Sequence, residues 1–120
     1  MTKVDTYYFI GIGGIGMSSI AKYLVANNFK VGGYDLTKTD ITETLEKSGI
    51  EINYKDELKS IPSPFTNQDV IVIFTPAITI KNRQLGFFKS QGNPIFKRAE
   101  FLGILTKKFK TIAIAGTHGK

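Results

Sequence analysis

Glycines recur at short intervals near the start of the chain, in the segment Gly11-Ile12-Gly13-Gly14-Ile15-Gly16-Met17. Gly11, Gly13 and Gly16 fit the G-x-G-x-x-G pattern, which lets a backbone turn approach the diphosphate of a nucleotide. A glycine has no Cβ, so it permits a tight turn and leaves room for a ligand beside the main chain. The chemistry that this glycine turn offers is therefore the binding of an anion by backbone N–H groups.

Two other segments could complete such a site. Asp35 follows Gly16 by 19 residues, and an acid at that distance can accept hydrogen bonds from a ribose. Thr75-Pro76-Ala77-Ile78 follows a strongly apolar run and could line the same crevice. Each has a purely structural alternative, because an Asp at a strand end often caps the next turn, and Thr75 to Ile78 could be a turn alone.

The last five residues, Gly116-Thr117-His118-Gly119-Lys120, follow an apolar segment as a phosphate-binding loop does. They do not complete the G-x-x-x-x-G-K-[ST] pattern, because Ile114 stands where its first glycine would be. The hydroxyl that would hold magnesium and the helix that would follow are not among these residues. Taken alone, this segment is as consistent with coincidence as with half of a phosphate site.

These segments need a sheet to position them, and apolar runs alternate with amphipathic stretches along the whole chain. The pattern predicts strands over residues 4–10, 29–35, 50–52, 69–74, 94–96 and 110–115. It predicts helices over residues 18–28, 41–47, 82–91 and 98–107, with a single helical turn over 56–61. Asp40 is the expected N-cap of the second helix.

The alternation of strand and helix predicts an α/β fold, a Rossmann-like parallel sheet of about five strands with helices on both faces in three layers. In such a sheet, ligands bind beyond the carboxyl ends of the strands, where the strand order reverses. The glycine turn, Asp35 and Thr75 each follow a predicted strand. They are therefore expected to meet at one edge of the sheet.

Composition bounds the class of protein. A length of 120 residues, with 42% apolar and 22% charged residues, is typical of one soluble globular domain. The absence of cysteine excludes disulfides and thiolate metal sites, and the one histidine, His118, cannot form a metal site alone. No stretch is long and apolar enough to span a bilayer and the start does not resemble a signal peptide, so a cytoplasmic protein without a membrane partner is expected.

The net charge of +6 raises the question of nucleic acid. The lysines, however, are spread along the chain at positions such as Lys22, Lys30, Lys38, Lys47, Lys55 and Lys59, and the densest group is Lys107, Lys108 and Lys110. A domain that binds a polyanionic small molecule accounts for the sign equally well, so no nucleic-acid partner is expected.

Several motifs, in this order and spacing, resemble the amino-terminal part of the Mur ligases, which build peptidoglycan precursors for the bacterial cell wall. They are Gly11 to Met17, Asp35, Ala77-Ile78, Arg98-Ala99-Glu100 and Ala115 to Lys120. The likeness covers essentially the whole chain. It is specific, because this family uses the short A-G-T-H-G-K form of the phosphate loop. It is greatest to the members that join L-alanine to UDP-N-acetylmuramate.

The resemblance implies a UDP-sugar-binding domain over residues 1–109, followed over 110–120 by the first strand and truncated phosphate loop of an ATP-binding domain. In that family ATP, with magnesium, phosphorylates the muramoyl carboxylate, and the amine of the amino acid then attacks. A carboxy-terminal domain brings the amino acid. Within residues 1–120 no side chain near the glycine turn is an evident nucleophile or base, so this segment is expected to bind and not to catalyse.

The likeness also implies roles for individual residues. The diphosphate would face Gly11, Gly13, Gly14, Gly16 and Met17; the uridine would contact Asp35 and Leu36; the nucleotide-sugar crevice would include Thr75 and Ala77; and ATP would contact Gly116, Thr117, His118, Gly119 and Lys120.

Three segments depart from the family's usual pattern. Asn53-Tyr54-Lys55 stands in place of Gly-His, Thr75-Pro76 in place of a serine pair, and Lys81-Asn82-Arg83-Gln84 in place of Asp-Asn-Pro-Glu. Because proline has no backbone N–H, any contact that such a donor makes at position 76 is lost.

Three alternatives stay open. A nicotinamide- or adenine-nucleotide-binding regulatory module would share the glycine turn and the acid, but it has no need of the terminal loop. A purely structural Rossmann domain would bind no ligand. Within the family, the ligase that recycles whole muropeptides onto UDP-N-acetylmuramate shares this layout.

Overall fold

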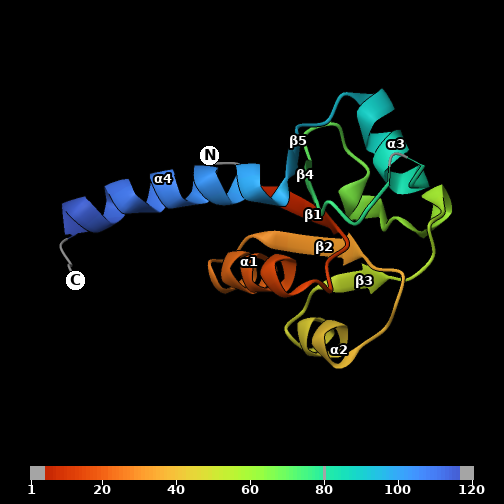
Figure 1. Cartoon of the computed structure of the whole chain (residues 1–120), viewed down its shortest axis with the longest axis horizontal. Coiled ribbons are helices and arrows are strands. Elements are labelled where there is room, and N and C mark those ends of the chain that lie inside the picture. The colour runs from red at the N-terminus through yellow and green to blue at the C-terminus, as the bar shows by residue number, and fades with distance from the viewer. Residues whose placement is uncertain (1–4, 80, 117–120) are drawn as a thin grey trace.

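A computed structural model describes residues 5–79 and 81–116 of the chain. For residues 108–116 it describes the backbone alone. Its centre is one parallel sheet in the order β3-β2-β1-β4-β5 (Figure 1). The strands are β1 (Thr6–Ile10), β2 (Lys30–Tyr34), β3 (Glu51–Asn53), β4 (Ile71–Phe74) and β5 (Ile95–Lys97). The predicted α/β sheet of about five strands is thus confirmed within the described residues.

The register aligns the carboxyl ends of the strands. Ile10, the last residue of β1, pairs with Tyr34 on one side and with Phe74 on the other. Tyr34 pairs in turn with Asn53, and Phe74 with Lys97. The loops after β1, β2 and β4 therefore leave the sheet at the same edge, and the strand order reverses between β1 and β4.

Helices cover both faces of the sheet, so the fold has the three predicted layers. They are α1 (Ile15–Ala26), α2 (Asp40–Lys47), α3 (Arg83–Gln91) and α4 (Arg98–Gly116), with short 3₁₀ turns at Leu58–Ser60 and Ser63–Phe65. Tyr7 and Phe9 of β1 pack in a core with α1, α2 and α4. Tyr8 and Ile10 point to the opposite face, into a second core with α3 and the 3₁₀ turns.

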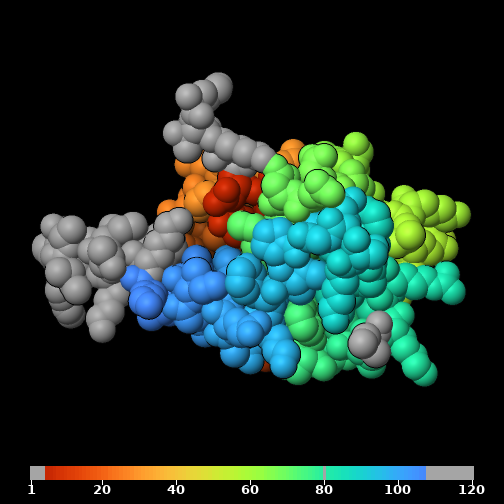
Figure 2. All heavy atoms as spheres, turned by 90° about the horizontal axis from the view of Figure 1, so that it is seen from above, coloured from red at the N-terminus to blue at the C-terminus, as the bar shows by residue number. Residues whose placement is uncertain are grey.

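Residues of α3, β5 and the first part of α4 lie side by side on one face of the molecule (Figure 2, cyan to blue). No helix in the described part of the chain has both the length and the apolar character needed to cross a bilayer.

Helix starts differ from the prediction in two places. Helix α1 begins at Ile15 and not at residue 18, so that Gly16 lies in its first turn and Gly14 is its N-cap. Asp40 is the wrong N-cap for α2, because the cap is Thr39. The hydroxyl of Thr39 accepts from the N–H of Thr42, and the hydroxyl of Thr42 accepts from the N–H of Thr39. This reciprocal pair satisfies two amides at once.

The strand predicted over residues 110–115 is also wrong, since α4 continues as a helix to Gly116. A strand needs a neighbouring strand for its hydrogen bonds, and among the described residues β5 forms the edge of the sheet. A helix satisfies its backbone groups internally. Of the predicted phosphate loop, Gly116 ends α4, whereas residues 117–120 lie outside the described residues.

Candidate functional site

Gly11 opens the turn that joins β1 to α1. It has a φ of +92°, and a Cβ at this position would collide with Cγ2 of Thr75. Its N–H and that of Ile12 both donate to the carbonyl oxygen of Tyr34, at 2.8 and 3.0 Å. The N–H of Thr75 donates to the carbonyl oxygen of Ile10 at 3.3 Å. Gly11 is thus required where the ends of β1, β2 and β4 meet, and Thr75 lies against the turn as predicted.

Gly13 is tied to Asp35. Its N–H donates to Oδ2 of Asp35 at 2.7 Å, and a Cβ on Gly13 would lie only 2.8 Å from that oxygen. The other carboxylate oxygen, Oδ1, accepts from the N–H of Thr37 at 3.1 Å. Asp35 therefore joins the glycine turn to the loop after β2, and the two features that the sequence singled out are in direct contact.

Gly14 and Ile15 form the open part of the turn. A Cβ on Gly14 would find its nearest neighbour at 3.7 Å, an ordinary contact distance, and the residue is exposed. Ile15 is 81% exposed. Packing within the described chain accounts for the other three glycines of the motif, but it does not account for Gly14. A glycine that the fold does not need is one that a ligand could need.

The first turn of α1 leaves amides open beside Gly14. The first hydrogen bond of the helix runs from the N–H of Ser18 to the carbonyl of Gly14, at 2.8 Å. Within the described residues, no acceptor is recorded for the N–H groups of Ile15, Gly16 and Met17. No acidic residue stands in this turn, and no side chain caps it. The positive end of α1 is therefore available to an anion.

The buried side chain of Met17 leaves only its backbone open at this site. Its side chain is 1% exposed and belongs to the core beneath α1. The predicted contact with a ligand is thus limited to the amide.

Gly16 faces Arg98, the first residue of α4. A Cβ on Gly16 would lie 3.0 Å from both Cδ and Nη1 of Arg98. Arg98 belongs to the Arg98-Ala99-Glu100 motif, but the sequence analysis assigned it no role in a site. Its position beside α1 depends on how β5 and α4 pack, which local patterns do not reveal.

A pocket of about 300 Å³ opens at the same edge of the sheet, between the loops after β2 and β4. It brings together Leu36, which is 77% exposed, and Ala77, both of which the sequence proposed. The full lining is Tyr34, Leu36, Asp56, Ala77, Ile78, Thr79, Lys81 and Asn82. Ile78 connects it to the glycine turn, because its Cγ1 lies 3.4 Å from where a Cβ of Gly11 would be.

Charge surrounds one side of this pocket. Burial, together with the nearby carboxylates of Asp56 and Asp35, raises the pKa of Tyr34 above its ordinary value. The carboxylate of Asp56 accepts from the N–H groups of Arg83 and Gln84, at 2.8 and 3.0 Å, at the start of α3. Sequence reasoning missed Asp56, whose signal is an acid that meets a helix start 27 residues later.

Asn53, one of the departures from the family pattern, belongs to a buried network below this pocket. Its Nδ2 donates to the hydroxyl of Tyr8 at 2.7 Å, and that hydroxyl donates to Oε1 of Gln84 at 2.6 Å. Nε2 of Gln84 donates back to Oδ1 of Asn53 at 2.9 Å. Burial raises the pKa of Tyr8, which keeps its proton for this bond. The network joins β1, β3 and α3.

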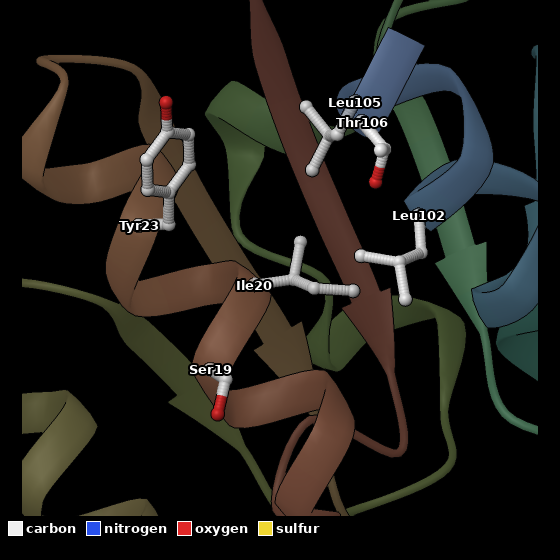
Figure 3. Close-up of a pocket in the computed structure, with 6 residues that line it drawn as sticks. All are labelled: Ser19, Ile20, Tyr23, Leu102, Leu105 and Thr106. Atoms are coloured by element: carbon white, nitrogen blue, oxygen red, sulfur yellow. The ribbon is translucent and has the colours of Figure 1, made fainter. Parts of the chain in front are cut away.

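A second hollow, of about 330 Å³, lies between α1 and α4 and differs in character (Figure 3). Ile20 of α1 and Leu102 of α4 point toward one another across it. None of its lining residues is charged. They are Ser19, Ile20, Tyr23, Leu102, Leu105 and Thr106. It offers no group for phosphate chemistry. In the described part of the chain, no cluster of three His, Asp or Glu side chains could hold a metal ion.

Sequence comparison places this chain beside known proteins. The family model described as "Mur ligase family, catalytic domain" matches residues 6–110. A UDP-N-acetylmuramate–L-alanine ligase of Cytophaga hutchinsonii is 49% identical over 121 residues, which cover 100% of this chain and 26% of that protein. One of Porphyromonas gingivalis is 48% identical over 114 residues, covering 94% and 25%. The chain thus spans about a quarter of the length of these curated relatives.

Solved structures show the same fold. The UDP-N-acetylmuramate-alanine ligase of Thermotoga maritima aligns with a TM-score of 0.77 and 30% identity, over 86% of this chain and 23% of that one. The UDP-N-acetylmuramate:L-alanyl-gamma-D-glutamyl-meso-diaminopimelate ligase of Neisseria meningitides aligns with a TM-score of 0.72. At 19% identity over 83% of this chain and 30% of that one, the second likeness concerns the fold alone.

Proposed function

The chain belongs to the Mur ligase family, and from this premise we propose that residues 1–109 bind the UDP portion of UDP-N-acetylmuramate. The protein would be an ATP-dependent ligase that joins L-alanine to that nucleotide sugar. The observation that carries the proposal is the set of open amides at Ile15, Gly16 and Met17, beside an exposed glycine that packing does not require.

The diphosphate fits this end of α1 on electrostatic grounds. Unpaired N–H groups and the helix dipole both favour negative charge, the dipole by about 1 kcal/mol. Gly14 is exposed and carries no side chain, so phosphate oxygens could approach the backbone there. The side chain of Met17, which is buried, takes no part.

The uridine fits the pocket between the loops after β2 and β4. Its volume of about 300 Å³ lies at the lower end of the range for small-molecule sites. Leu36, Ala77 and Ile78 offer apolar contact to a base, and the carboxylate of Asp35 can accept from a ribose hydroxyl. Pro76 has no N–H to donate, so recognition on this side would come from side chains and carbonyls.

Residues 110–120 would lead into an ATP-binding domain, whose phosphate loop would use Gly116 to Lys120. In the complete enzyme, ATP with magnesium would convert the muramoyl carboxylate to an acyl phosphate, which the amine of L-alanine attacks. The carboxylate of Asp35 at the glycine turn already accepts from two backbone N–H groups, so we assign these steps to the rest of the protein. Residues 1–109 would bind and orient the substrate.

Thermal unfolding of the 120-residue chain tests the proposal. UDP-N-acetylmuramate is expected to raise Tm, whereas NAD is not, because a ligand that binds the folded state stabilises it by RT ln(1 + L/Kd), where L is the concentration of free ligand. Gly14→Val should abolish the Tm shift without unfolding the chain, since a Cβ makes only ordinary contacts at this φ of −66° but the side chain would block the diphosphate.

The matched control is Gly86→Val, at another exposed glycine with nothing within 4 Å of its Cβ position. This variant should keep the full Tm shift. A Tm shift with NAD and none with UDP-N-acetylmuramate would overturn the proposal in favour of a dinucleotide-binding module.

A further inference from the structure

A guanidinium lies beside the open amides of α1. Arg98 directly follows β5 at the carboxyl edge of the sheet, and α4 packs on the same sheet face as α1. Its side chain reaches the first turn of α1, where Cδ and Nη1 lie 3.0 Å from the Cβ position of Gly16. A Cβ at residue 16 would therefore require the side chain of Arg98 to shift by a few tenths of an ångström.

In the part of the chain that the structure describes, the positive charge of Arg98 is not balanced by an acid at this contact. A cation at the positive end of a helix is unfavourable, and α1 has no acid in its first turn to compensate. Within the described residues, no ion pair or hydrogen bond is recorded for the guanidinium of Arg98. The nearest acid in the sequence, Glu100, is engaged elsewhere, because its Oε1 accepts from the N–H of Lys97 at 2.8 Å.

From this arrangement we infer that Arg98 is the side-chain cation of the diphosphate site; the inference rests on the proposed function. A bound diphosphate would balance both the guanidinium and the helix end. Arginine stays charged at any physiological pH and binds phosphate oxygens in a bidentate manner. The two glycines at the start of α1 then have different uses: Gly14 leaves room for the ligand and Gly16 leaves room for Arg98.

The test measures Kd by calorimetry for UDP-N-acetylmuramate and UDP, and by NMR titration for uridine. Arg98→Gln retains much of the side-chain length without the charge. It should weaken binding of both diphosphates by roughly ten- to a hundredfold, the range for a hydrogen bond to a charged group. It should leave uridine binding within twofold and reduce the salt dependence of Kd. Arg98→Lys should restore part of the affinity.

Lys97→Gln is the matched control, since it removes the neighbouring cation, which is exposed. This variant should change Kd by less than twofold. Unchanged diphosphate affinity and salt dependence in a folded Arg98→Gln variant would overturn the inference and leave the proposed function intact. Equal losses for uridine and UDP would also overturn it, because the arginine would then act only through the shape of the site.

The proposed function fails by a different result. If the unmodified chain binds neither UDP-N-acetylmuramate nor UDP, there is no diphosphate site for Arg98 to serve. The two failures are therefore distinguished by the unmodified chain alone.

Discussion

Oδ2 of Asp35 lies 2.7 Å from the backbone nitrogen of Gly13, so the acid at the end of β2 holds the glycine turn that follows β1. The same carboxylate accepts from the N–H of Thr37 through Oδ1. Asp35 thus organises the backbone on which the open amides of α1 depend. Its structural role and its proposed contact with the ribose share one side chain.

Replacement of Asp35 should therefore affect both stability and binding. Asp35→Ala leaves the N–H groups of Gly13 and Thr37 without their acceptor, and we expect the free energy of unfolding to fall by about 1–2 kcal/mol. Asp35→Asn keeps an oxygen acceptor and should lose less. Urea unfolding measures both, with Glu51→Gln on the exposed edge of β3 as control. Equal stability of Asp35→Ala and the unmodified chain would contradict this role.

Gly11 and Thr75 should be coupled energetically. Gly11→Ala adds a Cβ at a φ of +92° and against Cγ2 of Thr75, and the backbone strain alone costs about 1–2 kcal/mol. Thr75→Ser removes the colliding methyl group, so the double variant should recover the part of the loss that comes from the collision. A double-mutant cycle by urea unfolding measures this coupling. Strict additivity of the two substitutions would show that the collision with Thr75 does not contribute to the loss of stability.

Stability should fall in alkaline solution because of a buried tyrosine. Burial, and the neighbouring carboxylate of Asp5, raise the pKa of Tyr7 to about 12, above its ordinary value of 10.0. Below pH 10 this tyrosine is protonated in both states, so its contribution is fully present. Between pH 10 and about 12 the unfolded chain loses the proton first, so Tyr7 should contribute up to about 1.4 kcal/mol per pH unit to the fall in the free energy of unfolding. This adds to the contributions of Tyr8 and Tyr34, whose pKa values burial also raises.

Urea unfolding between pH 9 and 11.5 measures this slope. Tyr7→Phe should make it shallower, because phenylalanine has no proton to lose in this range. An unchanged slope in Tyr7→Phe would assign the alkaline loss to other groups.

Much of the fold could be predicted from the residues alone because its signals are local. The β-branched run from Val70 to Ile73 indicates a buried strand, and β4 forms there. Asn82 and Gly92 flank α3 as cap residues, so the helix ends at Gln91 as predicted and begins one residue after its predicted start. The order of strands and helices then left few topologies to consider.

For the candidate site, the sequence predicted the location but not the contacts that hold it together. The spacing of Gly11, Gly13, Gly16 and Asp35 predicted that a turn and an acid would meet at one edge of the sheet. It did not reveal why each glycine is needed, because the answer lies in residues far along the chain: Thr75 for Gly11, and Arg98 for Gly16. Such contacts depend on register and on side-chain packing, which no window of neighbouring residues contains.

The amino-acid sequence by itself determined the alternation of elements, the position of the glycine turn and the likeness to the Mur ligases, since these follow from residue types at fixed short intervals. Only the tertiary structure decided that Thr39 caps α2, that α4 continues through the segment predicted as a strand, and that a guanidinium stands at the start of α1. The reason is physical. The hydrogen-bond partners of a group are the groups that lie within about 3 Å of it. Which groups these are is decided only when the chain packs.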